Sequence, residues 1–148
     1  MNEPIHRREF VRRLPVLTAG LAACASTPVL TACAGAAYLT PVSGLDGFSI
    51  PAEAVRESGG VFIQNPDMRR PIYVHHSESG EWTAVLASCT HAGCQPEPLG
   101  NRLVCPCHGS EFSFAGEVLQ GPAERALTRY RVVEEGRRLM IRIDGGAA

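Results

Sequence analysis

Short apolar runs separated by turn-forming residues occupy the chain from Phe48 onward, a pattern that predicts β-strands. Ser79-Gly80 and Glu135-Gly136 have the composition of hairpin turns. A short helix is expected only at 51–58, because no other part of this region has helical periodicity. The candidate strands are 61–64, 72–75, 82–88, 102–105, 127–134 and 138–143. We therefore expect an all-β domain.

The N-terminal segment has a different pattern, basic at first and then uncharged. Arginine pairs at 7–8 and 12–13 precede a stretch from 14 to 43 whose only ionisable side chains are cysteine and tyrosine. A basic region followed by an apolar one is typical of an export signal, whereas an amphipathic cytosolic helix would need a polar face. Arg7-Arg8-Glu9-Phe10-Val11 resembles the twin-arginine signal. We expect export to the periplasmic face of the cytoplasmic membrane.

Two sequences in this segment resemble a lipoprotein cleavage box, in which an apolar and two small residues precede a cysteine. They end at Cys24 and Cys33, and Cys33 is favoured because 34–37 would provide a small, flexible tether. An uncleaved membrane anchor remains equally open, since the uncharged stretch exceeds the about 20 residues that a spanning helix needs. The expected organisation is a signal or anchor at 1–40, a linker at 41–47 and a folded domain at 48–146.

Composition and charge narrow the choice of function. A chain of 148 residues has room for one domain and a leader. The formal net charge of -1 gives no indication of a nucleic-acid binder. Two of the six cysteines lie in the N-terminal segment, and the other four fall within nineteen residues, beside two histidines. The two groups of cysteines therefore need separate explanations.

The second group lies in two expected loops, Cys89-Thr90-His91-Ala92-Gly93-Cys94 and Cys105-Pro106-Cys107-His108-Gly109-Ser110. Each loop offers a cysteine and a histidine, the donors needed to hold one iron by sulfur and another by nitrogen. A zinc ribbon, an isolated disulfide pair and a thioredoxin-like site are the alternatives. The spacing matches neither a usual zinc motif nor the C-x-x-C of thioredoxin. His75 and His76, in or beside a strand, are expected at the surface.

The two loops resemble the paired motifs C-x-H-x-G-C and C-P-C-H-G-S of the Rieske iron-sulfur proteins. As a domain, the resemblance covers residues 48–146 of this chain. The resemblance implies an antiparallel β sandwich or barrel with a small cluster-binding subdomain made of the two loops. It also implies one [2Fe-2S] cluster, with Cys89 and Cys105 on the inner iron and His91 and His108 on the outer one. A disulfide between Cys94 and Cys107 is implied as well, and such a bond persists outside a reducing cytosol.

Further positions bear on the reduction potential that the resemblance implies. Ser110 stands where high-potential members have a serine bonded to a bridging sulfide. Phe112 stands where they have a tyrosine bonded to a ligand cysteine, so we expect a potential below the top of the range. Ala92 replaces a leucine that often shields the cluster in quinol-oxidising relatives. Residues 121–125 resemble the family's proline loop, although an ordinary turn is an equal alternative.

The expected function is electron transfer without stand-alone catalysis, as the iron-sulfur subunit of a membrane-associated, quinol-oxidising chain of the cytochrome bc type. The expected partners are redox proteins, with quinol or a cytochrome as candidates. Attachment to the membrane is expected through an anchor or a lipid. No nucleic-acid partner is expected. A small subunit of a periplasmic molybdenum oxidoreductase similar to arsenite oxidase is an alternative. A cytosolic ring-dioxygenase ferredoxin is disfavoured by Cys94, Cys107 and the export signal, because those ferredoxins lack the disulfide.

Overall fold

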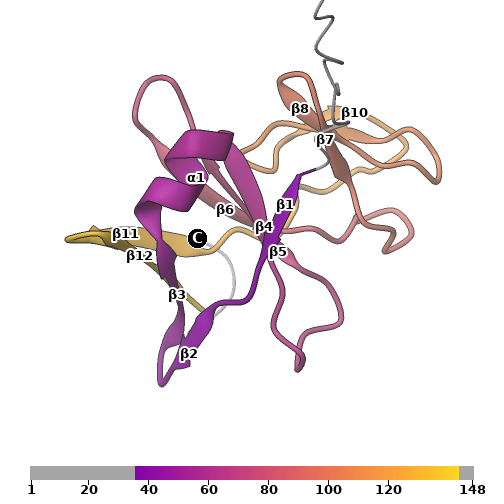
Figure 1. The fold of residues 1–148 in the computed structure, drawn as a ribbon. Helices are drawn as coiled ribbons and strands as arrows, with labels where there is room; N and C mark the ends of the chain where they lie inside the picture. Colours follow the sequence, from indigo (N-terminus) through magenta and orange to yellow (C-terminus); the bar gives the residue numbers. More distant parts are fainter. Residues whose placement is uncertain (1–35, 144–148) are drawn as a thin grey trace, which may run out of the picture. The chain divides into compact units, whose positions relative to one another are not determined.

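The computed structural model describes residues 36–143 (Figure 1). The arginine pairs and the candidate lipidation sites Cys24 and Cys33 lie outside the described residues, as do the last five residues. Within 36–143, no helix has the length and apolar character needed to cross a membrane.

Three four-stranded sheets and one short helix make up the described chain (Figure 1). The first sheet has the order β1 (Ala37–Leu39), β4 (Gly60–Ile63), β5 (Ile72–His76) and β6 (Trp82–Leu86). The second has the order β11 (Arg131–Glu135), β12 (Arg138–Arg142), β3 (Gly47–Pro51) and β2 (Val42–Gly44). The third has the order β10 (Val118–Gln120), β9 (Glu111–Phe112), β8 (Arg102–Val104) and β7 (Glu97–Leu99). Only β1 and β4 pair in parallel among these strands, which confirms the mostly antiparallel all-β fold.

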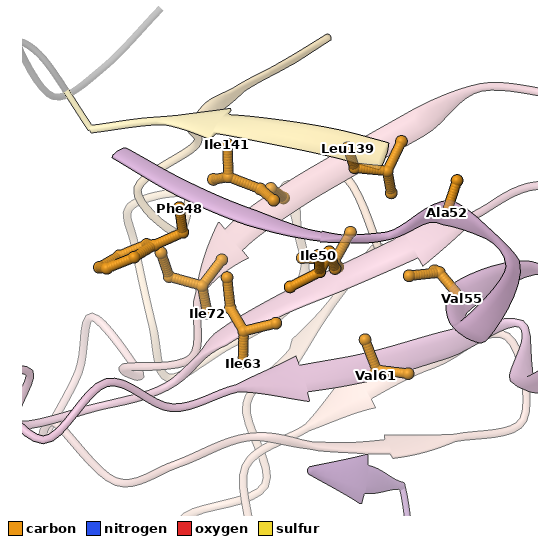
Figure 2. Packing of buried hydrophobic residues seen from close by; sticks show 11 residues of the cluster. Phe48, Ile50, Ala52, Val55, Val61, Ile63, Ile72, Leu139 and Ile141 are labelled. Atoms are coloured by element: carbon orange, nitrogen blue, oxygen red, sulfur yellow. The ribbon is translucent and has the colours of Figure 1, made fainter. Parts of the chain in front are cut away.

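The first sheet lies between the other two because both of its faces are apolar. Along β4, Val61 and Ile63 face one core, while Phe62 faces the other, as alternation in a strand requires. Figure 2 shows the first core, where β4 and β5 pack against β3, β12 and the helix. Burying each large aliphatic side chain there contributes about 1.5–3 kcal/mol. The second core contains Cys89 and Cys105, so the first sheet also supports the two cysteine loops.

The helix α1 (Ala52–Ser58) follows Pro51 and ends at Gly59, whose φ of 73° permits a left-handed C-terminal cap. Its exposed face is joined to the second sheet through Arg56, which donates to Glu134 at 2.6 Å and lies 5.0 Å from the centroid of the Trp82 ring. Trp82 also donates to Glu134 at 3.0 Å. These contacts hold α1, β6 and β11 together.

The folded domain begins earlier than the sequence predicted. The expected linker at 41–47 contains β2, which pairs with β3, and β1 pairs with β4. Tyr38 explains why β1 is held, because its ring stacks on Phe62 with centroids 5.0 Å apart and its hydroxyl accepts a hydrogen bond from Gln95 at 2.5 Å. A start at 48 is therefore too late.

Two further expectations need correction. The predicted strand at 127–134 is a strand only from Arg131, because the Leu127 N–H bonds the Gly116 carbonyl in another loop. His75 and His76, which were expected at the surface, are half-buried. The His75 ring stacks on Phe114 with centroids 4.1 Å apart, and burial followed by the charge of His76 lowers the pKa of His75. Neither histidine lies in the two cysteine loops.

Candidate metal centre

The two cysteine loops have the same backbone frame. The first, residues 89–94, follows β6, and the second, residues 105–110, connects β8 to β9. In each loop the N–H of the first cysteine bonds the carbonyl five residues later, at 2.8 Å in both. The glycine four residues after that cysteine returns a bond to its carbonyl, at 2.7 Å for Gly93 and 3.0 Å for Gly109. Both glycines have φ near +73°, so the frame favours glycine at these positions.

A disulfide joins the loops. The Sγ atoms of Cys94 and Cys107 are 2.00 Å apart, which confirms the predicted pairing. Cys89 and Cys105 remain free and buried, with 3% and 1% of their surface exposed. The bridge thus fixes the loops side by side and leaves one free thiol in each.

The free thiols are surrounded by hydrogen-bond donors. Burial raises the pKa of Cys89, but the backbone N–H of His91, the Cys105 thiol, the Ala92 N–H and the Ser110 hydroxyl outweigh burial and lower it overall. For Cys105, burial and the neighbouring Cys89 raise the pKa despite the N–H groups of Cys107 and His108. The first negative charge is therefore stabilised by the loops, whereas a second one is opposed by burial and by the first. Such a pair of thiols favours binding a cation, which would compensate both charges.

The histidines occupy the outer side of the loops. His91 and His108 are exposed, and their ring centroids are 4.9 Å apart with an interplanar angle of 84°. Neither imidazole is hydrogen-bonded to another residue of the described chain. Their nitrogens are thus available both to a metal and to solvent.

The segment 121–125, which was expected to be either a proline loop or an ordinary turn, lies against both cysteine loops. The Ala123 N–H donates to the Ser110 hydroxyl at 3.0 Å, and the Thr90 hydroxyl donates to the Arg125 carbonyl at 2.5 Å. Ala123 is buried, and the peptide bond between Gly121 and Pro122 is cis. Sequence reasoning missed the part played by Thr90, because its partner is thirty-five residues away and no spacing indicates it.

The positions expected to tune the site fall beside the thiols. Ser110 is fully buried, and its hydroxyl accepts the Ala123 N–H at 3.0 Å and lowers the pKa of Cys89. Phe112 is also fully buried, within the core that contains both free cysteines, and offers no hydroxyl. Ala92 is exposed on the first loop. The side of the site next to the sulfurs is therefore drier than the histidine side.

The donor set fits a cluster with unequal ligands. The Sγ atoms of Cys94, Cys105 and Cys107 lie within 4.8 Å of one another, but a disulfide removes Cys94 and Cys107 as thiolate donors. What remains in the two loops is two buried thiols and two exposed imidazoles, as mixed ligation of two irons requires. The four candidate ligands predicted from the sequence are thus placed in adjacent loops.

The fold and the site define a small β-protein with a candidate metal centre of mixed cysteine and histidine donors. The chain belongs to the Rieske [2Fe-2S] domain family, whose model matches residues 52–131. Membership in the family confirms the predicted cofactor, a [2Fe-2S] cluster.

The curated relatives include iron-sulfur subunits of a cytochrome b6-f complex and of a ubiquinol-cytochrome c reductase. The chain is 36% identical over 90 residues to the cytochrome b6-f complex iron-sulfur subunit of Chlorobaculum tepidum, covering 59% of this chain and 48% of that protein. It is 36% identical over 106 residues to the ubiquinol-cytochrome c reductase iron-sulfur subunit of Blastochloris viridis, covering 67% and 54%. The chain therefore spans about half the length of these relatives.

Solved structures agree with the fold. The plasma membrane Rieske protein of Synechocystis PCC 6803 matches with a TM-score of 0.56 and 34% identity, covering 62% of this chain and 94% of that one. A chain from the complex of oxygenase and ferredoxin in carbazole 1,9a-dioxygenase matches with a TM-score of 0.53 at 18% identity, a likeness of fold alone.

Proposed function

We propose that Cys89 and Cys105 bind one iron of the cluster and that His91 and His108 bind the other. The observation that carries this assignment is the contrast between the two pairs: both thiols are buried and free, and both imidazoles are exposed and unbonded within 36–143. Buried thiolates keep water from the sulfur side, whereas the histidines bring the other side to the surface. The disulfide and the segment 121–125 hold this arrangement from two directions.

We further propose that the chain transfers electrons as the iron-sulfur subunit of a quinol-oxidising chain of the cytochrome bc type. The bound cluster supplies one-electron oxidation and reduction. The exposed ring nitrogens of His91 and His108 accept a hydrogen bond from the donor and take up its proton, so electron and proton enter at the same surface. The names of the curated relatives support this class of complex.

A relay subunit of a periplasmic molybdenum oxidoreductase is the second candidate. The buried phenyl ring of Phe112 weakens the first function relative to a generic periplasmic electron carrier, since without a hydroxyl this residue cannot bond a ligand sulfur and raise the reduction potential. Exposed Ala92 supports the same conclusion, because a small side chain leaves the histidines in contact with water. Both features fit an electron carrier of moderate potential.

For the N-terminal segment we propose export through its twin-arginine-like signal and attachment at the periplasmic face of the cytoplasmic membrane. The lipid attachment sites would be Cys33 or Cys24, and an uncleaved anchor is the alternative. The disulfide supports an oxidising compartment, because such bonds are rare in the cytosol.

Potentiometry followed by EPR tests the choice between the two functions. Rieske centres span roughly -150 to +300 mV, and we expect a value within this range but below its top. A value high enough to accept electrons from quinol supports the first function. A midpoint well below that of quinone would exclude quinol oxidation and favour the relay.

A further inference from the structure

An open groove of about 840 Å³ runs beside the first cysteine loop. Gly93 lines it on the loop side, and Leu86 and Tyr130 line it on the side of the first sheet. Its other lining residues are Ser88, Met68, Arg69 and Arg70. We call this hollow the arginine groove. It lies outside the donor set of the metal centre but shares the loop that carries His91.

The charge of the arginine groove is uncompensated. Arg69 and Arg70 are exposed, and neither forms an ion pair or a side-chain hydrogen bond with another residue of 36–143. None of the residues lining the groove is acidic. Asp67 is exposed on the same loop, but it does not line the groove and pairs with neither arginine. Two neighbouring cations without a counter-charge attract carboxylates.

The backbone that presents the arginines is fixed. The Gln64 side-chain amide donates to the carbonyls of Asn65 and Met68 at 3.0 and 2.9 Å. The Met68 N–H bonds the Asn65 carbonyl at 3.0 Å, and the Pro71 carbonyl accepts from the Ala87 N–H at 2.9 Å. A rigid platform loses little backbone entropy when a partner docks, which favours recognition.

The opposite wall adds a neutral donor. Tyr130 is half-buried, and its phenol, whose ordinary pKa is about 10, is protonated at neutral pH; burial raises that pKa further. With two guanidinium groups on one side and a phenol on the other, the groove suits an acidic side chain approaching from outside. Leu86 and Met68 add apolar surface of the kind found in the cores of protein interfaces.

We propose that the arginine groove docks an acidic surface segment of the protein that exchanges electrons with the cluster. The proposal rests on the electron-transfer function above, and it names the chemistry of the partner at that same site. Charge complementarity and continuity with the His91 loop carry it: a carboxylate-bearing segment in the groove would hold the partner's redox centre next to the exposed histidines. Contacts of this kind chiefly steer association and fix orientation.

The test uses the purified, cluster-loaded protein and an acetylated hexaglutamate peptide carrying a red-emitting dye. Binding is measured by fluorescence anisotropy at low ionic strength. R69Q/R70Q should weaken binding about tenfold, from the loss of two surface charge contacts, and added salt should remove the difference. R137E is the matched control, since it also lowers the net charge by two and Arg137 is exposed in the turn between β11 and β12, without a side-chain partner in 36–143.

A redox measurement tests whether the arginines act on electron exchange at the exposed histidines. Oxidation of the reduced protein by ferricyanide, a small anion, should slow severalfold in R69Q/R70Q at low ionic strength and change little in R137E. An unchanged rate in R69Q/R70Q would overturn the proposal, as would equal weakening of peptide binding by R137E.

Two more outcomes are decisive. Tighter, arginine-dependent binding to phosphatidylglycerol vesicles than to the peptide would overturn the proposal in favour of a lipid surface. Failure of the wild-type protein to bind the peptide would overturn it as well, even if the cluster is redox-active. Peptide binding does not require a redox-active cluster, so a failure of the electron-transfer function would be detected separately, by potentiometry.

Discussion

The buried hydroxyl of Ser110 connects the second cysteine loop to two other parts of the site. It lowers the pKa of Cys89 in the first loop and accepts the Ala123 N–H from the segment 121–125. Because Ser110 is fully buried, water cannot replace either partner. A single side chain thus supports both the charge on the sulfur and the packing of the third segment.

Replacing Ser110 by Ala should therefore lower both stability and potential. An unpaired buried N–H at Ala123 costs about 1–3 kcal/mol of unfolding free energy. Loss of the hydroxyl that stabilises negative charge on Cys89 should lower the midpoint potential, by about 40 mV for each ~1 kcal/mol difference between redox states. Denaturant unfolding and potentiometry measure the two effects.

Ser113 offers a matched control for this change. Its hydroxyl also accepts a backbone N–H, from Glu117, but in an exposed turn. We expect S113A to leave the potential unchanged and to cost less stability, since water can replace the lost bond. Equal potentials for wild type and S110A would contradict the role of Ser110.

The chemistry of individual residues was more predictable than their packing. Cys94 and Cys107 could be paired from resemblance because the spacing within the loops is specific. The roles of Thr90, Arg69 and Arg70 could not be predicted from the sequence, since they depend on segments that only the fold brings close together. His75 was misjudged for the same reason: the ring of Phe114 covers it from another loop.

At the scale of elements, the second sheet contains one close backbone contact, between Gly47 in β3 and Ile141 in β12. Gly47 in β3 has φ of 148°, and a Cβ there would lie 2.0 Å from the carbonyl oxygen of Ile141 in β12. Its neighbour across the hairpin, Gly44 in β2, would place a Cβ no nearer than 3.7 Å from any such atom. The two glycines therefore differ sharply in what they tolerate.

We expect G47A to destabilise the domain by about 3 kcal/mol, because the backbone of β12 must move. G44A should cost less than about 1 kcal/mol, since its Cβ makes an ordinary contact. Denaturant unfolding of both variants measures the difference. Similar losses in the two would show that the pairing of β3 with β12 is looser than the structure indicates.

The disulfide between Cys94 and Cys107 also stabilises the arrangement of elements, because it joins two loops that connect different strands. C94S/C107S removes the bridge without leaving a lone thiol. A bond closing a loop of about 15 residues contributes about 3 kcal/mol, so the cluster should assemble in the variant but be lost faster on warming. Visible absorbance followed over time measures this loss. Equal retention in the wild-type protein and the variant would mean that the segment 121–125 alone holds the loops.

Strands were predictable where apolar runs were long enough to show alternation. The central strands β5, β6 and β12 agree with the sequence to within two residues. The short strands β7, β9 and β10 were missed because pairing, and not composition, defines them. Residues 127–130 have an apolar pattern but form no regular strand. Instead, the Tyr130 N–H bonds the Ala84 carbonyl, and Leu127 is buried in the second core.

For the whole molecule, the sequence predicted one folded domain behind a distinct N-terminal segment, but it placed the start of the domain too late. Aromatic stacking of Tyr38 on Phe62 draws β1 into the first sheet, and no local pattern indicates that contact. The arginine groove was beyond prediction as well, since Arg70 and Tyr130 are far apart in the sequence and meet only in the fold.

The proposed export signal can be tested in the full chain. R7K/R8K keeps the positive charge but removes the arginine pair, so it should leave the protein in the cytoplasm. R12K/R13K changes the second pair in the same way and should be exported normally. Cell fractionation with detection of the protein measures both. Normal export of R7K/R8K would overturn the signal assignment.

The central claim is that one iron is held by sulfur and the other by imidazole nitrogen. Mössbauer spectroscopy of the oxidised, ⁵⁷Fe-enriched protein tests it most directly, because sulfur and nitrogen donors give iron different electron densities. We predict two quadrupole doublets of equal area, one for the iron on Cys89 and Cys105 and one for the iron on His91 and His108. A single doublet, or a colourless protein containing zinc after cluster-competent expression, would contradict the account.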